Sequence, residues 1–133
     1  NEYDVLVLGS STWGAGELQD DWYDGVNVLK KCDLSHKYVA LFGCGDSDSY
    51  SDTFCDAIGI IYEDLKDAHC KFCGAVDTAG YTFDSSIAVV DGKFIGLPID
   101  EVIDKLSGIQ CGFRGTSCPD QLSKALISYK ENN

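Results

Sequence analysis

Two short stretches of small residues each carry one large aromatic side chain. Trp13 lies within residues 9–17 and Tyr50 within residues 43–52, both rich in glycine and serine. Glycines let such loops reorient their peptides, and a lone ring among small residues is poor material for a core. A ring in this setting makes a flat wall for a planar ligand, so we expect the two aromatics to clamp one ring system. Each alone would equally suit a surface aromatic beside the start of a helix.

A second candidate for chemistry is the pair formed by Cys70 and Cys73, whose spacing suits a redox dithiol or a zinc site. The sequence has no second pair at similar spacing, and His69 alone does not complete a zinc site. The seven cysteines are an odd number, and a chain able to form a core does not need disulfides. We therefore expect reduced thiols in a reducing compartment, no metal site, and ordinary small buried side chains.

The charge of the chain restricts its partners. Twenty-two Asp and Glu against 10 Lys and Arg give a net charge of -12. Because this field repels phosphate backbones, nucleic acid is not expected as a partner, whereas basic protein surfaces are. No apolar run reaches the roughly 18 to 20 residues of a membrane-spanning helix, so we do not expect an integral membrane protein.

The elements that would position the two aromatics follow an α/β pattern. Aliphatic runs at residues 3–9 and 38–43, with a weaker run at 69–76, are typical of strands buried on both faces of a parallel sheet. Helical periodicity fills the intervals at residues 17–31 and 51–67. The alternation predicts an open parallel sheet with helices on both faces, and such sheets bind ligands at the carboxyl ends of their strands. The predicted core is Val5, Val7, Leu8, Val39, Leu41, Phe42, Ile58, Ile61 and Leu65.

Residues 78–98 interrupt the alternation. Two short apolar runs flank Asp91 and Gly92, which predicts a hairpin inserted into the last strand. Beyond it, residues 109–115 have strand character and residues 119–130 have helical periodicity. The sequence shows no internal repeat, so we expect residues 1–133 to form a single domain.

These motifs resemble those of the flavodoxins. Residues 3–22, with Ser11-Thr12-Trp13-Gly14, resemble the family's third strand and first flavin loop. Residues 42–54, with Gly45-Asp46 and Tyr50-Ser51-Asp52, resemble the fourth strand and second flavin loop. Residues 80–101 resemble the insertion of the long-chain subclass, as in algal and cyanobacterial members. The resemblance covers residues 2–102 and leaves residues 103–133 as a divergent tail.

The resemblance implies a flavodoxin-like fold and a low-potential, one-electron carrier, not an enzyme, that binds FMN non-covalently. Trp13 and Tyr50 would stack on the two faces of the isoalloxazine, and the peptide after Trp13 would turn its carbonyl toward the flavin N5. The implied FMN-binding residues are Thr12, Trp13, Gly14, Gly45, Asp46, Tyr50 and Asp52. No catalytic side chain and no metal are implied. The partners would be redox proteins with basic surfaces, in the chloroplast stroma or alternatively in the cytoplasm.

One part of the family pattern has no counterpart here. Flavodoxins begin with a strand, a phosphate-binding loop and a second strand, which are missing before residue 3. Either the unit belongs to a longer chain, or residues 109–130 replace it, with Thr116 and Ser117 near the phosphate. Alternatively, the protein has lost FMN and serves as a structural subunit of a larger complex, such as a photosynthetic one. In each case the strand at residues 3–9 has a bare apolar edge to cover.

Overall fold

The computed structural model describes residues 3–100 and, beyond them, only Gln121, Lys124, Ala125 and Ser128. The chain divides into two compact units, Asn1–Ile99 and Asp100–Asn133. In the second unit, the four described residues after Asp100 are helical and exposed, and they fall within the helix predicted over residues 119–130. The strand predicted over residues 109–115, with Thr116 and Ser117, lies outside the described residues. The single-domain organisation remains a prediction.

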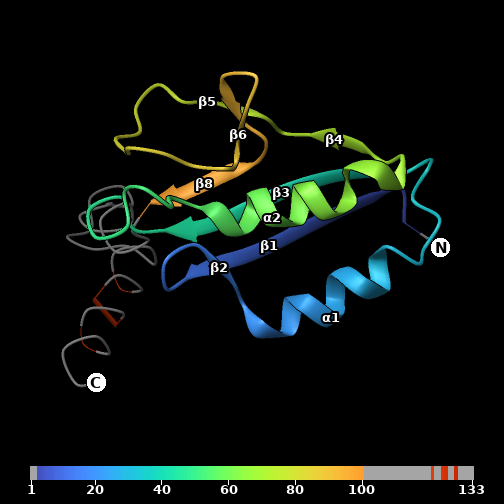
Figure 1. Ribbon diagram of the computed structural model, residues 1–133, viewed down its shortest axis with the longest axis horizontal. Helices are drawn as coiled ribbons and strands as arrows, with labels where there is room; N and C mark the ends of the chain where they lie inside the picture. The colour runs from blue at the N-terminus through green and yellow to red at the C-terminus, as the bar shows by residue number, and fades with distance from the viewer. Residues whose placement is uncertain (1–2, 101–120, 122–123, 126–127, 129–133) are drawn as a thin grey trace. The chain divides into compact units, whose positions relative to one another are not determined.

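A parallel pair of long strands forms the centre of the first unit (Figure 1). β1 (Val5–Trp13) and β3 (Tyr38–Gly45) pair in register from Val5↔Tyr38 to Ser11↔Cys44. Both strands are longer than predicted, because pairing continues through residues that were expected to be loop. Trp13 is therefore the last residue of a strand, and Gly45 is too.

Three shorter strands complete this sheet. β4 (Lys71–Cys73) runs parallel to β3, and β8 (Leu97–Asp100) also pairs with β3. β2 (Glu17–Leu18) pairs antiparallel with the end of β1, opposite Thr12 and Trp13. The order is β2-β1-β3-β4, with β8 joining at β3. The parallel α/β fold is thus confirmed.

The last strand is split, as predicted, because β4 and β8 both pair with β3 and a small second sheet lies between them in the sequence. That sheet contains β5 (Val76–Asp77), β6 (Val89–Val90) and β7 (Lys93–Phe94), in the order β5-β7-β6. β6 and β7 form a hairpin whose turn residues Asp91 and Gly92 have φ of 52° and 79°. Positive φ at both turn positions matches the twist of antiparallel strands.

The described helices are α1 (Asp20–Leu29), α2 (Asp56–Leu65) and the short 3₁₀ helix η1 (Lys66–Ala68). α2 crosses in front of β1 and β3 in Figure 1, and α1 is joined to α2 by the ion pair between Lys30 and Asp64. The helix predicted over residues 119–130 belongs to the second unit. No helix in the described part of the chain is long and apolar enough to cross a membrane.

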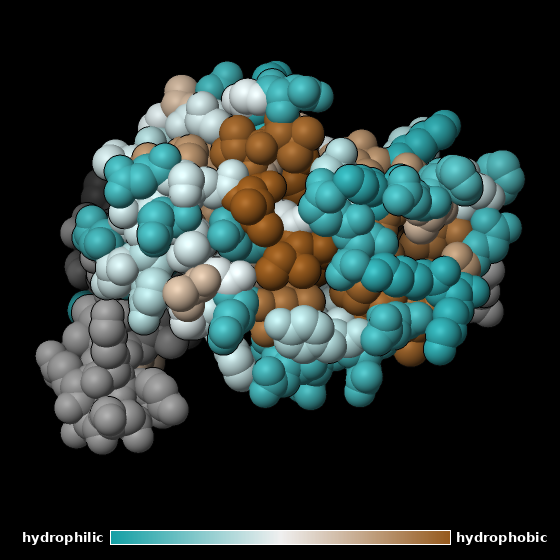
Figure 2. Space-filling view, viewed as in Figure 1, coloured by the Kyte–Doolittle hydropathy of each residue, from teal (hydrophilic) through white to brown (hydrophobic). Residues whose placement is uncertain are grey.

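The core lies between α2 and the face of the sheet that α2 covers. It confirms five predicted residues, each at most 3% exposed: Val39, Leu41, Ile58, Ile61 and Leu65. Partly buried apolar side chains, including Leu8, pack around them. From the α2 side, Figure 2 shows apolar surface as a band framed by polar residues.

Three predicted core residues are exposed: Val5 by 53%, Val7 by 65% and Phe42 by 39%. Side chains alternate along a strand, so Leu6 and Leu8 pack toward the core while Val5 and Val7 point to the other face. Within residues 3–100 nothing covers that face. Phe42 lies across the strand over Gly9, where an added Cβ would meet its ring at 2.1 Å.

The cysteines of the described region are all free thiols: Cys32, Cys44, Cys55, Cys70 and Cys73. Only Cys55 is fully buried, whereas Cys32 and Cys73 are exposed. The expectation of ordinary buried side chains is therefore wrong for these two.

Candidate ligand-binding site

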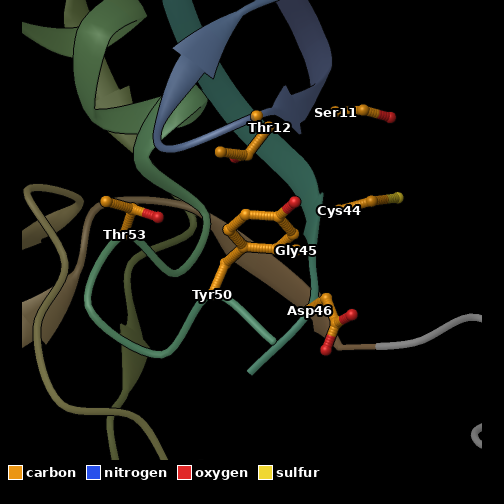
Figure 3. Close-up of a pocket in the computed structure, with 8 residues that line it drawn as sticks. Ser11, Thr12, Cys44, Gly45, Asp46, Tyr50 and Thr53 are labelled. Atoms are coloured by element: carbon orange, nitrogen blue, oxygen red, sulfur yellow. The ribbon is translucent and has the colours of Figure 1, made fainter. Parts of the chain in front are cut away.

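A cavity of about 260 Å³ opens at the carboxyl ends of β1 and β3 (Figure 3). It is lined by Ser11, Thr12, Gly14, Cys44, Gly45, Asp46, Tyr50 and Thr53. Ser11 and Cys44 are direct neighbours in the β1–β3 register, so the parallel pairing itself brings the two lining segments together. This edge of the sheet is where an open parallel fold is expected to hold a ligand.

The first lining segment turns sharply after β1. Gly14 and Gly16 have φ of 49° and 94°, which glycine adopts at little cost. A Cβ at Gly16 would lie 3.0 Å from the Asp56 carboxylate, so the turn packs closely on the start of α2. Thr12 fixes it further, because its Oγ1 accepts a hydrogen bond from the Ala57 N–H at 3.1 Å. The segment is therefore anchored to α2.

The second lining segment is a turn built around Asp46. Its Oδ1 accepts hydrogen bonds from the backbone N–H groups of Asp48 at 3.1 Å and Ser49 at 3.0 Å. Its carbonyl accepts another from Tyr50 N–H at 3.0 Å. In Figure 3 the Tyr50 ring lies amid the labelled residues, with Thr12 on one side and Asp46 on the other. The ring remains 45% exposed, which leaves a face open to a ligand.

The cavity brings together five of the seven predicted site residues: Thr12, Gly14, Gly45, Asp46 and Tyr50. Trp13 is not among the lining residues; it pairs with Glu17 across β2 and is 47% exposed. Asp52 is exposed and does not line the cavity, and its carbonyl accepts a hydrogen bond from the Ser85 hydroxyl. The roles predicted for all seven residues remain predictions.

Three lining residues were missed from the sequence: Ser11, Cys44 and Thr53. The first two adjoin predicted residues and would follow from knowing how far the strands pair. Thr53 had no sequence signal. Its hydroxyl oxygen is buried and has no hydrogen-bond partner among the described residues.

The electrostatics of the cavity favour an uncharged ligand edge. Burial raises the pKa of the Cys44 thiol, only partly offset by a hydrogen bond with Ser11, so the thiol stays protonated. Burial also raises the pKa of Asp56, although the N–H of Ile87 and the side chain of Ser86 hydrogen-bond to its carboxylate. The lining residues described include no Lys, Arg or His. A planar group with hydrogen-bonding edges suits this surface better than a phosphate does.

Comparison with known proteins identifies two family models that match the chain. The flavodoxin family model matches residues 1–94, and the TSCPD domain model matches residues 91–130. The parallel sheet with a hairpin within its last strand is an α/β architecture that agrees with the match to the flavodoxin model. The chain belongs to the flavodoxin family.

The relatives named here are bacterial. The chain is 45% identical to flavodoxin 1 of Azotobacter vinelandii over 108 residues, which is 78% of this chain and 62% of that protein. It is 46% identical to a Synechocystis flavodoxin over 100 residues, 75% of this chain and 59% of that protein. The crystal structure of Fusobacterium nucleatum flavodoxin bound to flavin mononucleotide aligns with a TM-score of 0.72 at 25% identity, covering 97% of this chain and 71% of that one. The chain spans about three fifths of the length of the curated relatives.

Proposed function

We propose that the protein binds FMN non-covalently in the cavity at the ends of β1 and β3 and transfers single electrons, without acting as an enzyme. The observation that carries this proposal is that five of the residues implied by the flavodoxin resemblance, from two separate segments, line one cavity. The FMN carried by the structurally similar Fusobacterium protein supports it.

The residues present fit the ring of FMN. Tyr50 offers a half-exposed aromatic face, and the turn at Gly14 leaves room beside it. Gly45 and Asp46 would offer backbone groups to a ring edge. Trp13, exposed at the end of β1, would cover the outer face of the ring, and Asp52 would stay at the rim of the Tyr50 turn.

FMN, when bound, supplies the redox chemistry by taking up and releasing one electron at a time. The protein's contribution is to orient the ring and to set its electrostatic surroundings. Asp46 at the cavity and the net charge of -12 would disfavour additional negative charge on a flavin bound in the cavity. They would therefore lower the reduction potential of that flavin. The same charge would steer the protein toward redox partners with basic surfaces. The relatives named above are bacterial, and this favours the cytoplasm over the chloroplast stroma as the proposed location of the protein.

The test is a titration of the flavin-free protein with FMN, followed by quenching of flavin fluorescence. Aromatic stacking contributes about 1 to 3 kcal/mol per ring, so Trp13→Ala and Tyr50→Ala should each raise Kd by roughly 5- to 150-fold. Tyr23→Ala is the matched control, since Tyr23 lies on α1 and is 52% exposed. If the unmutated protein does not quench FMN, the electron-carrier proposal fails and the structural-subunit alternative takes its place.

Riboflavin, which lacks the phosphate of FMN, tests in the same titration whether the phosphate contributes to binding. The described cavity contacts a ring but offers no basic group to a phosphate. If no other segment of this chain binds the phosphate, riboflavin and FMN should bind with equal affinity. Stronger binding of FMN would mean that the chain supplies a phosphate site, as the replacement of the missing unit by residues 109–130 requires.

A further inference from the structure

We propose that the inserted segment at residues 81–88 positions the Tyr50 turn, with Ser51 and Asp84 as the positioning residues. The proposal rests on the proposed flavin site, because Tyr50 is the aromatic wall of that cavity. Neither Ser51 nor Asp84 lines the cavity. Their effect on a bound ring would pass through Tyr50.

Ser51, the residue directly after Tyr50, is held to the inserted segment through both its backbone and its side chain. Its carbonyl accepts hydrogen bonds from the N–H groups of Asp84 at 2.8 Å and Ser85 at 3.0 Å. Its hydroxyl donates a third to Asp84 Oδ2 at 2.6 Å. Three bonds on one residue restrain it far more than one would.

The attachment continues along the turn. The Ser85 hydroxyl donates to the carbonyl of Asp52, and Phe54 N–H donates to the carbonyl of Ser85 at 3.3 Å. The Phe54 side chain is fully buried, with its ring centroid 5.7 Å from that of Phe83 and 6.0 Å from that of Phe94. The inserted segment thus contacts the stretch from Ser51 to Phe54 at both ends.

The turn's own hydrogen bonds do not provide this restraint. Tyr50 N–H donates to the Asp46 carbonyl at 3.0 Å, and its own carbonyl accepts from Thr53 N–H at 3.2 Å. Both bonds are internal to the turn, so they fix its local shape but not its orientation on the domain. The bonds of Ser51 to Asp84 and Ser85, together with those of Asp52 and Phe54, instead join the stretch after Tyr50 to the inserted segment. We therefore infer that they orient the Tyr50 ring at the cavity.

The first test measures FMN affinity and the visible circular dichroism of the bound flavin in Asp84→Ala. One partly exposed hydrogen bond lost should weaken FMN binding by about 3- to 10-fold and change the dichroism even at saturating FMN. Asp84→Asn, which keeps an oxygen acceptor for the Ser51 hydroxyl, should restore most of both. Asp77→Ala is the matched control, because Asp77 lies in β5, outside residues 81–88, and accepts a comparable exposed hydrogen bond from Ala79 N–H.

A double-mutant cycle separates positioning from a general loss of stability. If Asp84 acts through Tyr50, Asp84→Ala should cost little further affinity in a Tyr50→Ala background. Fully additive losses would overturn the proposal.

Hydrogen exchange in the flavin-free protein keeps the test independent of FMN. The amides of residues 50–54 should exchange faster in Asp84→Ala than in the unmutated protein, while those of α2 stay unchanged. Unchanged exchange at residues 50–54 would refute the positioning role. Absence of FMN quenching in the unmutated protein would instead refute the flavin site.

Discussion

Because α2 packs closely on the inserted segment, substitution of Gly59 in α2 tests that contact directly. Alanine in a helix interior is normally better than glycine by about 0.5 to 1 kcal/mol. At Gly59, however, an added Cβ would lie 2.7 Å from Ile87 Cγ1 and 2.8 Å from the backbone nitrogen of Ala88. The side-chain contact could rotate away, but the backbone contact cannot. Gly59→Ala must therefore separate α2 from residues 87–88.

The magnitude follows from two opposed contributions. Overpacking of this kind costs about 1 to 3 kcal/mol, and the gain in helix propensity offsets part of it. We expect Gly59→Ala to lower the free energy of unfolding by about 1 to 2 kcal/mol. Gly25→Ala is the matched control in α1, because a Cβ there would lie 3.4 Å from the Trp22 ring, an ordinary contact. It should raise the free energy of unfolding by about 0.5 to 1 kcal/mol.

Urea unfolding followed by far-ultraviolet circular dichroism measures both variants under the same conditions. Opposite signs for the two substitutions are the expected result. If Gly59→Ala stabilised the protein as much as Gly25→Ala, the described contact between α2 and residues 87–88 would be refuted.

Three other substitutions examine burial and charge. Burial raises the pKa of Asp56, so the folded protein favours the protonated carboxyl group. The stabilisation that results is complete below the unfolded-state pKa of about 3.9. It is lost as the pH rises through the higher pKa of the folded state. The stability of Asp56→Asn relative to the unmutated protein should therefore increase between pH 4 and pH 7 in urea unfolding, and a constant difference would contradict this. On the sheet, Val7→Ser, at a residue 65% exposed, should change stability by less than about 0.5 kcal/mol, whereas Ile61→Ala, at a fully buried residue, should cost about 2 to 5 kcal/mol. A large loss at Val7 would show that its face of the sheet is covered.

The sequence predicted the elements better than their faces. An unbroken aliphatic run such as residues 3–9 indicates a strand, but it does not say whether both faces are covered, since that depends on segments elsewhere. Val5 and Val7 were placed in the core for this reason. The predictions for Ile58 and Ile61 are confirmed, because helical periodicity by itself identifies the apolar stripe of α2.

The site shows the same limit. The aromatic turns were found because glycine and serine around a lone ring are visible in the sequence. The ends of the strands could not be found in the same way, because the pairing of Ser11 with Cys44 depends on register and not on composition. Since β1 extends to Trp13 and Thr12 is bonded to α2, alternation turns the Trp13 side chain away from α2. No sequence pattern indicated the link between Ser51 and Asp84, which lie 33 residues apart.

The division of the last strand into β4 and β8 also bears on how the domain folds. β3 must collect strands from both sides of the insertion, and contacts so distant along the chain form slowly because a long loop has to close. The hairpin at Asp91–Gly92 is local and can form within about 1 to 10 μs. Once formed, it shortens the free chain between β4 and β8 and so lowers the entropic cost of closing that loop. The turn at Asp91–Gly92 would thus influence the folding rate of the sheet without belonging to it.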